Sequence, residues 1–446
     1  LLWSAQSWRW SPMDFLANLE DGHGMDWPIR YEDLAPWYDL VEKTIGVSGS
    51  LEGLPQLPDG IFQKPMEMNA AEKVLRDATA EKFPDRRVII GRVAILTEPH
   101  DRRHPCHYCG PCERGCFRGS IYTTQSSALP AARRTGNLTL LPRKQVESVL
   151  HKDGKATGVR VIDMHSGEME EYTARVVFMC ASAPSTVRIL LNSRNAEFPD
   201  GLANSSGTLG HYMLNHHTRL GARGYLDNLK DRYYIGDRPC IVYVPRFRNI
   251  DAKSRHPDFV RGYSLGGRAR REGWQRGSNM PGFGASFKET LRDPGRWSIG
   301  LQGLGEVLPY KDNYMTLDDE LTDKWGMPAV RFHVRRYDNE MKMREDMIAT
   351  AAEMLEAAGA TDIETYNREH VALGNTNHEM GGARMGRDPQ TSVLNGWNQA
   401  HDIPNLFVTD GACMASAANQ NPALTFMALT ARATHYAVDQ LKKGEI

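Results

Sequence analysis

The chain has 446 residues, which is enough for two or three domains with a large hydrophobic core. Its 54 basic and 55 acidic residues give a formal net charge of −1, so charge provides no argument for binding to nucleic acid or to an anionic membrane. No apolar run approaches the roughly 20 residues that a membrane-spanning helix needs, and the sequence therefore predicts no transmembrane span.

The first fifteen residues, LLWSAQSWRWSPMDF, contain no strand–G-x-G-x-x-G–helix pattern, which is the fingerprint of a dinucleotide-binding domain. Nothing later in the chain replaces this pattern. The glycine pairs at 266–267 and 381–382 do not stand between a strand and a helix in a recognisable βαβ unit.

Residues 27–49, WPIRYEDLAPWYDLVEKTIGVSG, predict an amphipathic helix. Asp33 is expected to cap its start, apolar residues recur at helical spacing from Leu34 to Val41, and Gly46 closes it. We expect this helix to have a structural role.

Four of the seven cysteines fall within eleven residues, at the spacing C-x2-C-x2-C-x3-C: Cys106, Cys109, Cys112 and Cys116. Glycines in this short segment let it curl so that several thiolates face one point. The spacing is that of the bacterial ferredoxin run, although Phe117 stands where proline usually follows. The sequence therefore predicts an iron–sulfur cluster with three or four irons. A structural zinc site and disulfides are the alternatives, although zinc sites normally pair two separated C-x2-C knuckles and short disulfide loops are strained.

The middle of the chain alternates between helix and strand patterns. Residues 126–136 predict a helix, 138–142 (LTLLP) a short strand and 146–173 a β-meander, which leads into an apolar strand at 176–181 and a helix. Period-2 patterns at 240–247, 283–289, 297–308 and 329–336 predict an antiparallel sheet. Residues 339–360 predict an amphipathic helix that ends near Gly359.

The end of the chain holds the pattern most closely tied to chemistry. Residues 405–411, NLFVTDG, predict a buried parallel strand whose carboxyl end faces a ligand crevice. Asn421 and Pro422 then open a helix, whose start offers free N–H groups and a partial positive charge. His378 stands upstream in a glycine-rich loop, HEMGGARMG. If these groups meet, they can take a proton from an alcohol while an electron acceptor receives a hydride.

His378 and Asn421 also have a purely structural interpretation. His378 can be an ordinary hydrogen-bonded loop histidine, and Asn421 can be a helix cap, since asparagine is among the best caps. A side chain that caps a helix is not free to bind substrate, so the two roles of Asn421 compete.

The C-terminal motifs resemble the signature of the glucose–methanol–choline (GMC) family of FAD-dependent alcohol oxidoreductases. The motifs are H-x-x-G-G-x-x-x-G from His378, N-L-F-V-x-D-G from 405 and N-P-x-x-T from Asn421. The resemblance implies that His378 is the base for the substrate hydroxyl and that Asn421 holds the same oxygen. It also implies noncovalent FAD in contact with several segments: Trp3, Ser4, Val146, Ala181, Asp410, Gly411, Pro422 and Thr425. Plain packing is the alternative for Val146 and Ala181.

Residues 210–216, GHYMLNH, resemble the family's G-x-x-L-x-x-H element, with Met213 where leucine is usual. This element leads from the flavin domain to the substrate domain. Adjacent histidines tend to point in different directions, so we expect at most one of His216 and His217 to touch the active site.

The resemblance implies an α/β fold, a GMC-type two-domain flavoprotein. Its FAD-binding (Rossmann-like) domain carries the β-meander, and an antiparallel-sheet substrate domain lies beside it. We expect residues 1–30, 125–215 and 366–446 in the FAD-binding domain, 31–97 and 216–365 in the substrate domain, and a cysteine-rich iron–sulfur loop at 98–124. Residues 1–15 resemble a family segment that follows the dinucleotide fingerprint, so we expect the fingerprint itself to lie upstream of Leu1.

A cysteine cluster beside a flavin resembles the multi-subunit bacterial sugar dehydrogenases of the family. The resemblance implies oxidation of a sugar or glycoside hydroxyl and electron relay through the cluster to a cytochrome c or quinone. It also implies a small export or chaperone-like subunit and a periplasmic location, with a cytoplasmic one as the alternative. The competing functions are an oxygen-using GMC oxidase, a dehydrogenase for non-sugar alcohols, and an iron–sulfur electron-transfer subunit that binds no flavin.

Overall fold

The computed structural model describes residues 3–110, 112–232, 237–368 and 377–446. Among them, the largest sheet has seven strands, each antiparallel to its neighbours, in the order β1-β8-β9-β10-β7-β13, with β6 also paired to β10. The strands are β1 (Ile89–Ile90), β6 (His216–His217), β7 (Leu220–Leu226), β8 (Val242–Val244), β9 (Tyr263–Arg271), β10 (Trp297–Glu306) and β13 (Thr361–Asn367). The predicted antiparallel sheet is confirmed for 240–247 and 297–308, whereas 329–336 pairs in a separate two-stranded hairpin.

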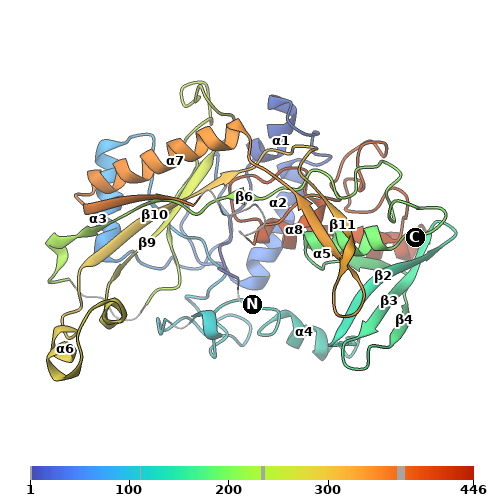
Figure 1. The fold of residues 1–446 in the computed structure, drawn as a ribbon, viewed down its shortest axis with the longest axis horizontal. Helices are drawn as coiled ribbons and strands as arrows, with labels where there is room; N and C mark the ends of the chain where they lie inside the picture. The colour runs from blue at the N-terminus through green and yellow to red at the C-terminus, as the bar shows by residue number, and fades with distance from the viewer. Residues whose placement is uncertain (1–2, 111, 233–236, 369–376) are drawn as a thin grey trace.

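One long helix, α7 (Asp338–Ala357), lies along this sheet (Figure 1). Its methionines Met343, Met347 and Met354 are fully buried in one core cluster with Leu301 of β10. The predicted amphipathic helix is therefore confirmed. A second helix, α3 (Ala70–Lys82), contributes to the same cluster.

The strand expected at 283–289 is wrong, because this segment forms a short helix, α6 (Gly284–Thr290). It belongs to a projection between β9 and β10 that extends away from the rest of the molecule (Figure 1). Phe283 is 90 % exposed there, so no packed face stabilises a period-2 arrangement of side chains.

A parallel strand pair, β5 (Val177–Met179) and β14 (Leu406–Val408), organises the other half of the fold. Helix α5 (Ala183–Asn192) begins soon after β5, and α8 (Ala423–Lys443) follows β14 and packs against α2 (Tyr31–Ile45). Because parallel strands end at the same edge, the segments that follow β5 and β14 meet there.

The β-meander is confirmed as β2 (Lys144–Lys152), β3 (Lys155–Asp163) and β4 (Met169–Thr173). The separate strand expected at 138–142 is wrong. Leu140 and Leu141 are exposed, and β2 takes β3 as its ladder partner. Without a buried face or a partner strand, this apolar run stays irregular.

The remaining described elements are α1 (Pro12–Asp21), α4 (Ala128–Arg134), the hairpin of β11 (Tyr314–Thr322) and β12 (Pro328–His333), and short 3-10 turns at 112–114, 227–229, 274–279 and 411–413. Asp33 is not the cap residue of α2. Arg30 holds that position, and the Asp33 carboxylate accepts a hydrogen bond from Arg30 N at 2.8 Å. Within the described ranges, we find no helix with the length and apolarity needed to cross a bilayer.

A buried ion pair joins the start of the chain to α2. Arg9 donates to Glu42 through Nε at 2.8 Å and through Nη2 at 2.5 Å, and Glu42 also accepts from Ile61 N at 2.8 Å. The Glu42 side chain has no exposed surface, and that of Arg9 is 5 % exposed. The pair therefore depends on its own hydrogen bonds to offset the loss of hydration.

Replacing Glu42 with alanine is expected to lower the free energy of unfolding by about 3 kcal/mol, because the Arg9 charge stays buried without its main partner. Chemical denaturation measures this change. Glu364→Ala is the control, since Glu364 pairs with Arg223 on the surface and its loss should matter far less. Equal stability of the two variants would contradict the structural role of the buried pair.

Candidate active site

The glycine-rich loop 378–386 lies directly against residues 411–413, which follow β14. Three backbone hydrogen bonds of 2.8 to 3.0 Å join the two segments. Gly381 has a φ of 75°, and a Cβ there would stand 2.0 Å from the carbonyl oxygen of Tyr212. A Cβ on Gly411 would stand 2.3 Å from a carbonyl oxygen of the loop. Glycine at 411 therefore lets the two segments approach this closely, and glycine at 381 lets the loop approach the backbone at Tyr212.

The approach brings three polar side chains together. His378 Nε2 lies 3.1 Å from Asn421 Nδ2, and His378 Nδ1 lies 2.8 Å from Nδ1 of His216. His216 Nε2 in turn lies 2.9 Å from the carbonyl oxygen of Ala418. The neighbouring ring, His217, points elsewhere and packs against Gly305. Of the two adjacent histidines, the structure places only His216 at His378.

The contacts of Asn421 show whether its side chain caps helix α8 or is left for another role. The cap position of α8 is Pro422, and no side chain makes a cap hydrogen bond there. The Asn421 amide instead contacts the His378 ring. Its side chain is therefore not used as a helix cap and lies against the His378 ring.

The electrostatic environment keeps the histidines neutral. Burial, together with the neighbouring His216, lowers the pKa of His378 to about 3. Burial also lowers the pKa of His216 below its ordinary value of 6.5. A neutral imidazole at pH 7 can accept a proton, which is what a general base requires.

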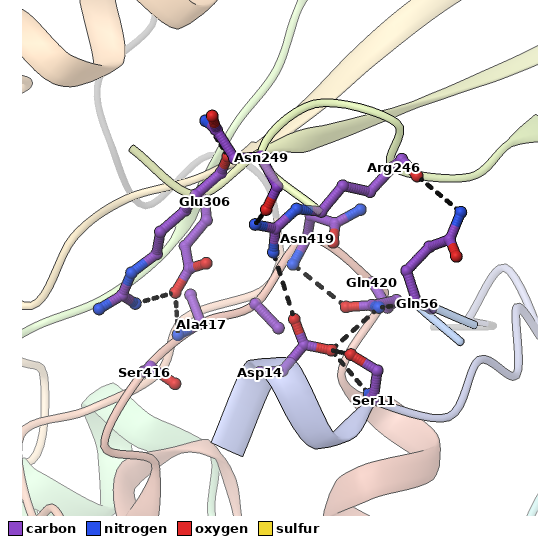
Figure 2. A network of polar contacts seen from close by, with 12 residues as sticks. Ser11, Asp14, Gln56, Arg246, Asn249, Glu306, Ser416, Ala417, Asn419 and Gln420 are labelled. Carbon is purple, nitrogen blue, oxygen red and sulfur yellow. Dashed lines mark hydrogen bonds and ion pairs between the residues drawn. The ribbon is translucent and has the colours of Figure 1, made fainter. Parts of the chain in front are cut away.

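Buried charges hold the loop that carries Asn421 (Figure 2). Glu306, at the end of β10, accepts from Arg261 Nη1 at 2.5 Å and from the backbone N–H of Ala417 at 3.3 Å. Both charged side chains are at most 3 % exposed. This pair fixes the segment whose carbonyl groups face His216.

A second buried contact holds the same loop from the side of α1. Asp14 accepts from Ser11 N at 2.7 Å and from Gln420 Nε2 at 3.2 Å, and Arg246 Nη1 lies 3.9 Å away (Figure 2). These residues belong to no motif that identifies them from the sequence. The one available signal is a charged residue, Glu306, at the end of an otherwise uncharged strand.

The residues expected to bind the cofactor fall into two groups. Ala181 is exposed directly after β5, and Asp410 follows β14. The Asp410 carboxylate accepts from Thr186 Oγ1 at 2.5 Å and from Ala412 N at 2.9 Å, and Gly411 is buried beside it. Ala181 and Ser182 are small and exposed at this edge, which leaves room for a flat cofactor, while their backbone N–H groups are used within the protein by Thr186 Oγ1 and the Asp410 carboxylate.

The second group is more dispersed. Ser4 is exposed and Trp3 is half-buried near the start of the chain, while Val146 lies half-buried on β2. Pro422 and Thr425 lie at the start of α8, where the Thr425 hydroxyl bonds to the Tyr38 hydroxyl at 2.8 Å. The hydroxyl of Thr425 is therefore occupied within the protein, and its role toward a cofactor stays a prediction.

The four cysteines lie in one loop. Burial raises the pKa of Cys106 and Cys112, and the neighbouring thiols raise both further. Burial also acts to raise the pKa of Cys116, but hydrogen bonds from backbone N–H groups such as that of Ile121 outweigh it. Within the part of the chain that the structure describes, no three His, Cys, Asp or Glu side chains are arranged to hold a metal ion.

The cysteine loop is tied to the start of the chain. Trp3 Nε1 donates to the carbonyl oxygen of Tyr122 at 2.8 Å, Tyr122 N donates to Ala94 O at 2.9 Å, and Ala94 N donates to Ala5 O at 2.8 Å. The loop, drawn in cyan, lies near the N-terminus in Figure 1. Trp3 and Ser4 are among the residues expected to bind the cofactor, so the cysteines lie near that region.

Comparison with known proteins gives concordant similarities. Residues 93–217 match the N-terminal sequence model of the GMC oxidoreductases, and residues 309–430 match the C-terminal one. The chain is 32 % identical over 444 residues to 2-methyl-1,2-propanediol dehydrogenase of Mycolicibacterium austroafricanum, covering 96 % of this chain and 78 % of the relative. It is 26 % identical over 452 residues to the fructose dehydrogenase large subunit of Gluconobacter japonicus, covering 99 % and 80 %. Its fold resembles the crystal structure of pyridoxine 4-oxidase from "Mesorbium loti" with a TM-score of 0.57 and 14 % identity, covering 98 % of this chain and 82 % of that one.

The neutral state of the buried histidines has a consequence for stability. Burial lowers the pKa of His217 well below 6.5, so between pH 7 and 5.5 the unfolded chain takes up a proton that the folded chain does not. Stability at this site is therefore lost as the pH falls. When the pH falls from 7 to 5.5, the free energy of unfolding of His217→Leu should therefore rise by about 1 kcal/mol relative to that of the native protein.

Chemical denaturation at the two pH values measures this difference. His165→Leu is the control, because His165 lies exposed in a turn and its removal should cause no comparable change. If the free energy of unfolding changes with pH by the same amount in His217→Leu and in the native protein, the conclusion that the buried His217 ring is neutral is contradicted.

Proposed function

The chain belongs to the GMC oxidoreductase family, and from this we propose that it is an FAD-dependent dehydrogenase for a hydroxyl of a sugar or glycoside. It has the two-domain fold of that family and acts on alcohol or sugar hydroxyls. The observation that carries the proposal is the contact of a neutral His378 with the Asn421 amide. An imidazole that accepts a proton and an amide that donates a hydrogen bond are the two groups that alcohol oxidation needs on the oxygen side.

The residues divide the work as follows. A substrate oxygen placed between His378 Nε2 and Asn421 Nδ2 replaces their mutual contact, gives its proton to the histidine and accepts a hydrogen bond from the amide. The alcohol carbon loses a hydride, so one proton and one hydride together convert the alcohol to a carbonyl compound. Bound FAD supplies the two-electron acceptor for that hydride.

The residues that would hold FAD are those near the shared edge of β5 and β14, Ala181, Asp410 and Gly411, with Trp3 and Ser4. The family implies FAD binding, and the exposed small residues at this edge fit it. A visible absorbance spectrum of the full-length natural protein tests this assignment, and a protein without flavin absorbance would favour the electron-transfer subunit.

The names of two relatives point to different substrate classes. One relative is named a fructose dehydrogenase, which favours a sugar, whereas the other is named for a small branched diol. A panel of monosaccharides, glycosides and 1,2-diols, assayed with an artificial electron acceptor, separates the two. Turnover of the diols alone would contradict the sugar proposal.

We propose that an iron–sulfur cluster on Cys106, Cys109, Cys112 and Cys116 relays the electrons. The spacing of the cysteines and the backbone N–H groups directed at Cys116 support it, although in the described part of the chain no three of these side chains are arranged to hold a metal ion. Hydrogen bonds from Tyr122 to Ala94 and from Ala94 to Ala5 link the cysteine loop to the start of the chain, where we expect Trp3 and Ser4 to contact the flavin. A cluster supplies single-electron transfer, which favours an external acceptor over oxygen.

In this proposal the electron acceptor is a cytochrome c or a quinone. The enzyme itself works in the periplasm and associates with a small export subunit. Reduction of added cytochrome c or quinone during turnover supports the relay. Stoichiometric hydrogen peroxide under air, with neither acceptor reduced, would instead establish an oxygen-using oxidase.

Replacing His378 with alanine is expected to lower kcat about a thousandfold while FAD content stays unchanged, because the base is lost and the cofactor contacts remain. Steady-state kinetics with the best substrate of the panel measure this. His165→Ala is the matched control and should keep full activity. Near-native kcat in the His378 variant would refute the assignment.

The double variant Cys106→Ala/Cys109→Ala is expected to lose all iron and acid-labile sulfide and to stop reducing cytochrome c, because a cluster needs these thiolates. Elemental analysis and the visible spectrum give the result. Cys240→Ala is the control, since Cys240 lies outside the C-x2-C-x2-C-x3-C run, is fully buried and donates its thiol hydrogen to the Gly91 carbonyl oxygen. Iron-free or zinc-only native protein would rule the relay out.

A further inference from the structure

Only one placement of the proton on the His216 ring matches the hydrogen-bond acceptors around it. The ring is fully buried, and Nε2 lies 2.9 Å from Ala418 O and 3.2 Å from Ala417 O. Carbonyl oxygens only accept hydrogen bonds, so Nε2 must carry the proton. Burial lowers the pKa of His216 and keeps the ring neutral at pH 7, although the Glu306 carboxylate acts in the opposite sense. Nδ1 therefore has a lone pair and can only accept.

This assignment determines the proton positions on the next ring. His216 Nδ1 lies 2.8 Å from His378 Nδ1, and two lone pairs at that distance would repel each other. His378 must therefore donate through Nδ1–H, which leaves the lone pair on Nε2. The Asn421 Nδ2 group, 3.1 Å from Nε2, donates to that lone pair. Every donor in the chain of contacts then meets an acceptor.

We infer that His216 is a positioning residue that selects the tautomer of His378 with a free Nε2 lone pair. The inference rests on the proposed function, since it matters only if His378 Nε2 takes the substrate proton. The other tautomer carries Nε2–H, which cannot accept a proton from a hydroxyl. His216 contacts neither Asn421 nor the expected substrate position, so it acts only through His378.

The fold holds His216 rigidly in this orientation. It pairs with Glu306 in the β6–β10 ladder, and its backbone N–H donates to the Asn215 side chain at 2.7 Å. Glu306 in turn binds Ala417 N, so the same residue fixes both the strand that carries the ring and the carbonyl loop that the ring contacts (Figure 2). The tautomer of His378 is therefore set by a contact between the sheet and the loop before α8.

Two substitutions at position 216 separate positioning from packing. His216→Leu removes the acceptor, whereas His216→Asn places an amide oxygen near the former Nδ1 and keeps it. The leucine variant should lose kcat about 10- to 100-fold with KM nearly unchanged, the loss typical of removing a group that orients a functional histidine. The asparagine variant should recover most of that loss. Steady-state kinetics on FAD-loaded natural enzyme, with FAD content and thermal midpoint recorded, give the result.

His217→Leu is the matched control, because His217 lies in the same two-residue strand, is equally buried and does not contact His378. It should keep kcat within about twofold. Equal kcat losses in His216→Asn and His216→Leu, or in His217→Leu and His216→Leu, would overturn the inference. If His216→Leu does not fold, His216→Phe replaces it as the acceptor-free variant.

The same assay keeps this inference distinct from the proposed function. Native enzyme that turns over the substrate and His378→Ala that does not will establish the base, whatever the variants at position 216 do. If the native enzyme oxidises no alcohol, the proposed function itself is contradicted. Native-like kcat in a folded His216→Leu, with His378→Ala inactive, overturns the positioning role alone.

Discussion

The candidate active site depends on one close contact, that of the loop 378–386 with the segment after β14. The loop can lie there because Gly411 leaves room for the carbonyl oxygen of Glu379, at a distance that no Cβ tolerates, while Gly381 leaves room in the same way for that of Tyr212. Everything that the proposed chemistry needs follows from this approach. It places the His378 ring in front of the start of α8, where Asn421 is released from capping and turns toward the ring.

Burial disfavours charge on both kinds of group around this contact, but Arg261 has carboxylate partners that outweigh this effect and the histidines do not. Imidazoles lose their charge when buried, so the His378 ring is neutral at pH 7 and has a free lone pair, although its lowered pKa makes it a weaker base until substrate and cofactor are bound. Glu306 and Arg261 stay paired through short hydrogen bonds and use their charges to hold the adjacent loop. Because Glu306 and Arg261 hold the adjacent loop, His378 can keep its position while its protonation state changes during turnover.

The parts of this fold that could be predicted from sequence are those whose pattern is local. The strand at 405–411, the glycine-rich loop and the helix after Asn421 each carry their own signal within a few residues. The partner of His378 could not be assigned in the same way, since His216 lies 162 residues away and either of two adjacent rings could have faced it. The register of β6 against β10 makes that choice, and it also brings Glu306 to the loop. The errors at 138–142 and 283–289 have one cause, an apolar alternation that meets no sheet.

The state of His378 is the most direct test of this account. Nitrogen-15 NMR of protein with labelled histidine, assigned by comparison with His378→Asn, reports which ring nitrogens carry protons at pH 7. We expect a neutral His378 ring with the proton on Nδ1 and a bare Nε2, because His216 accepts from the first and Asn421 donates to the second. A doubly protonated ring, or a neutral ring with the proton on Nε2, would contradict the account.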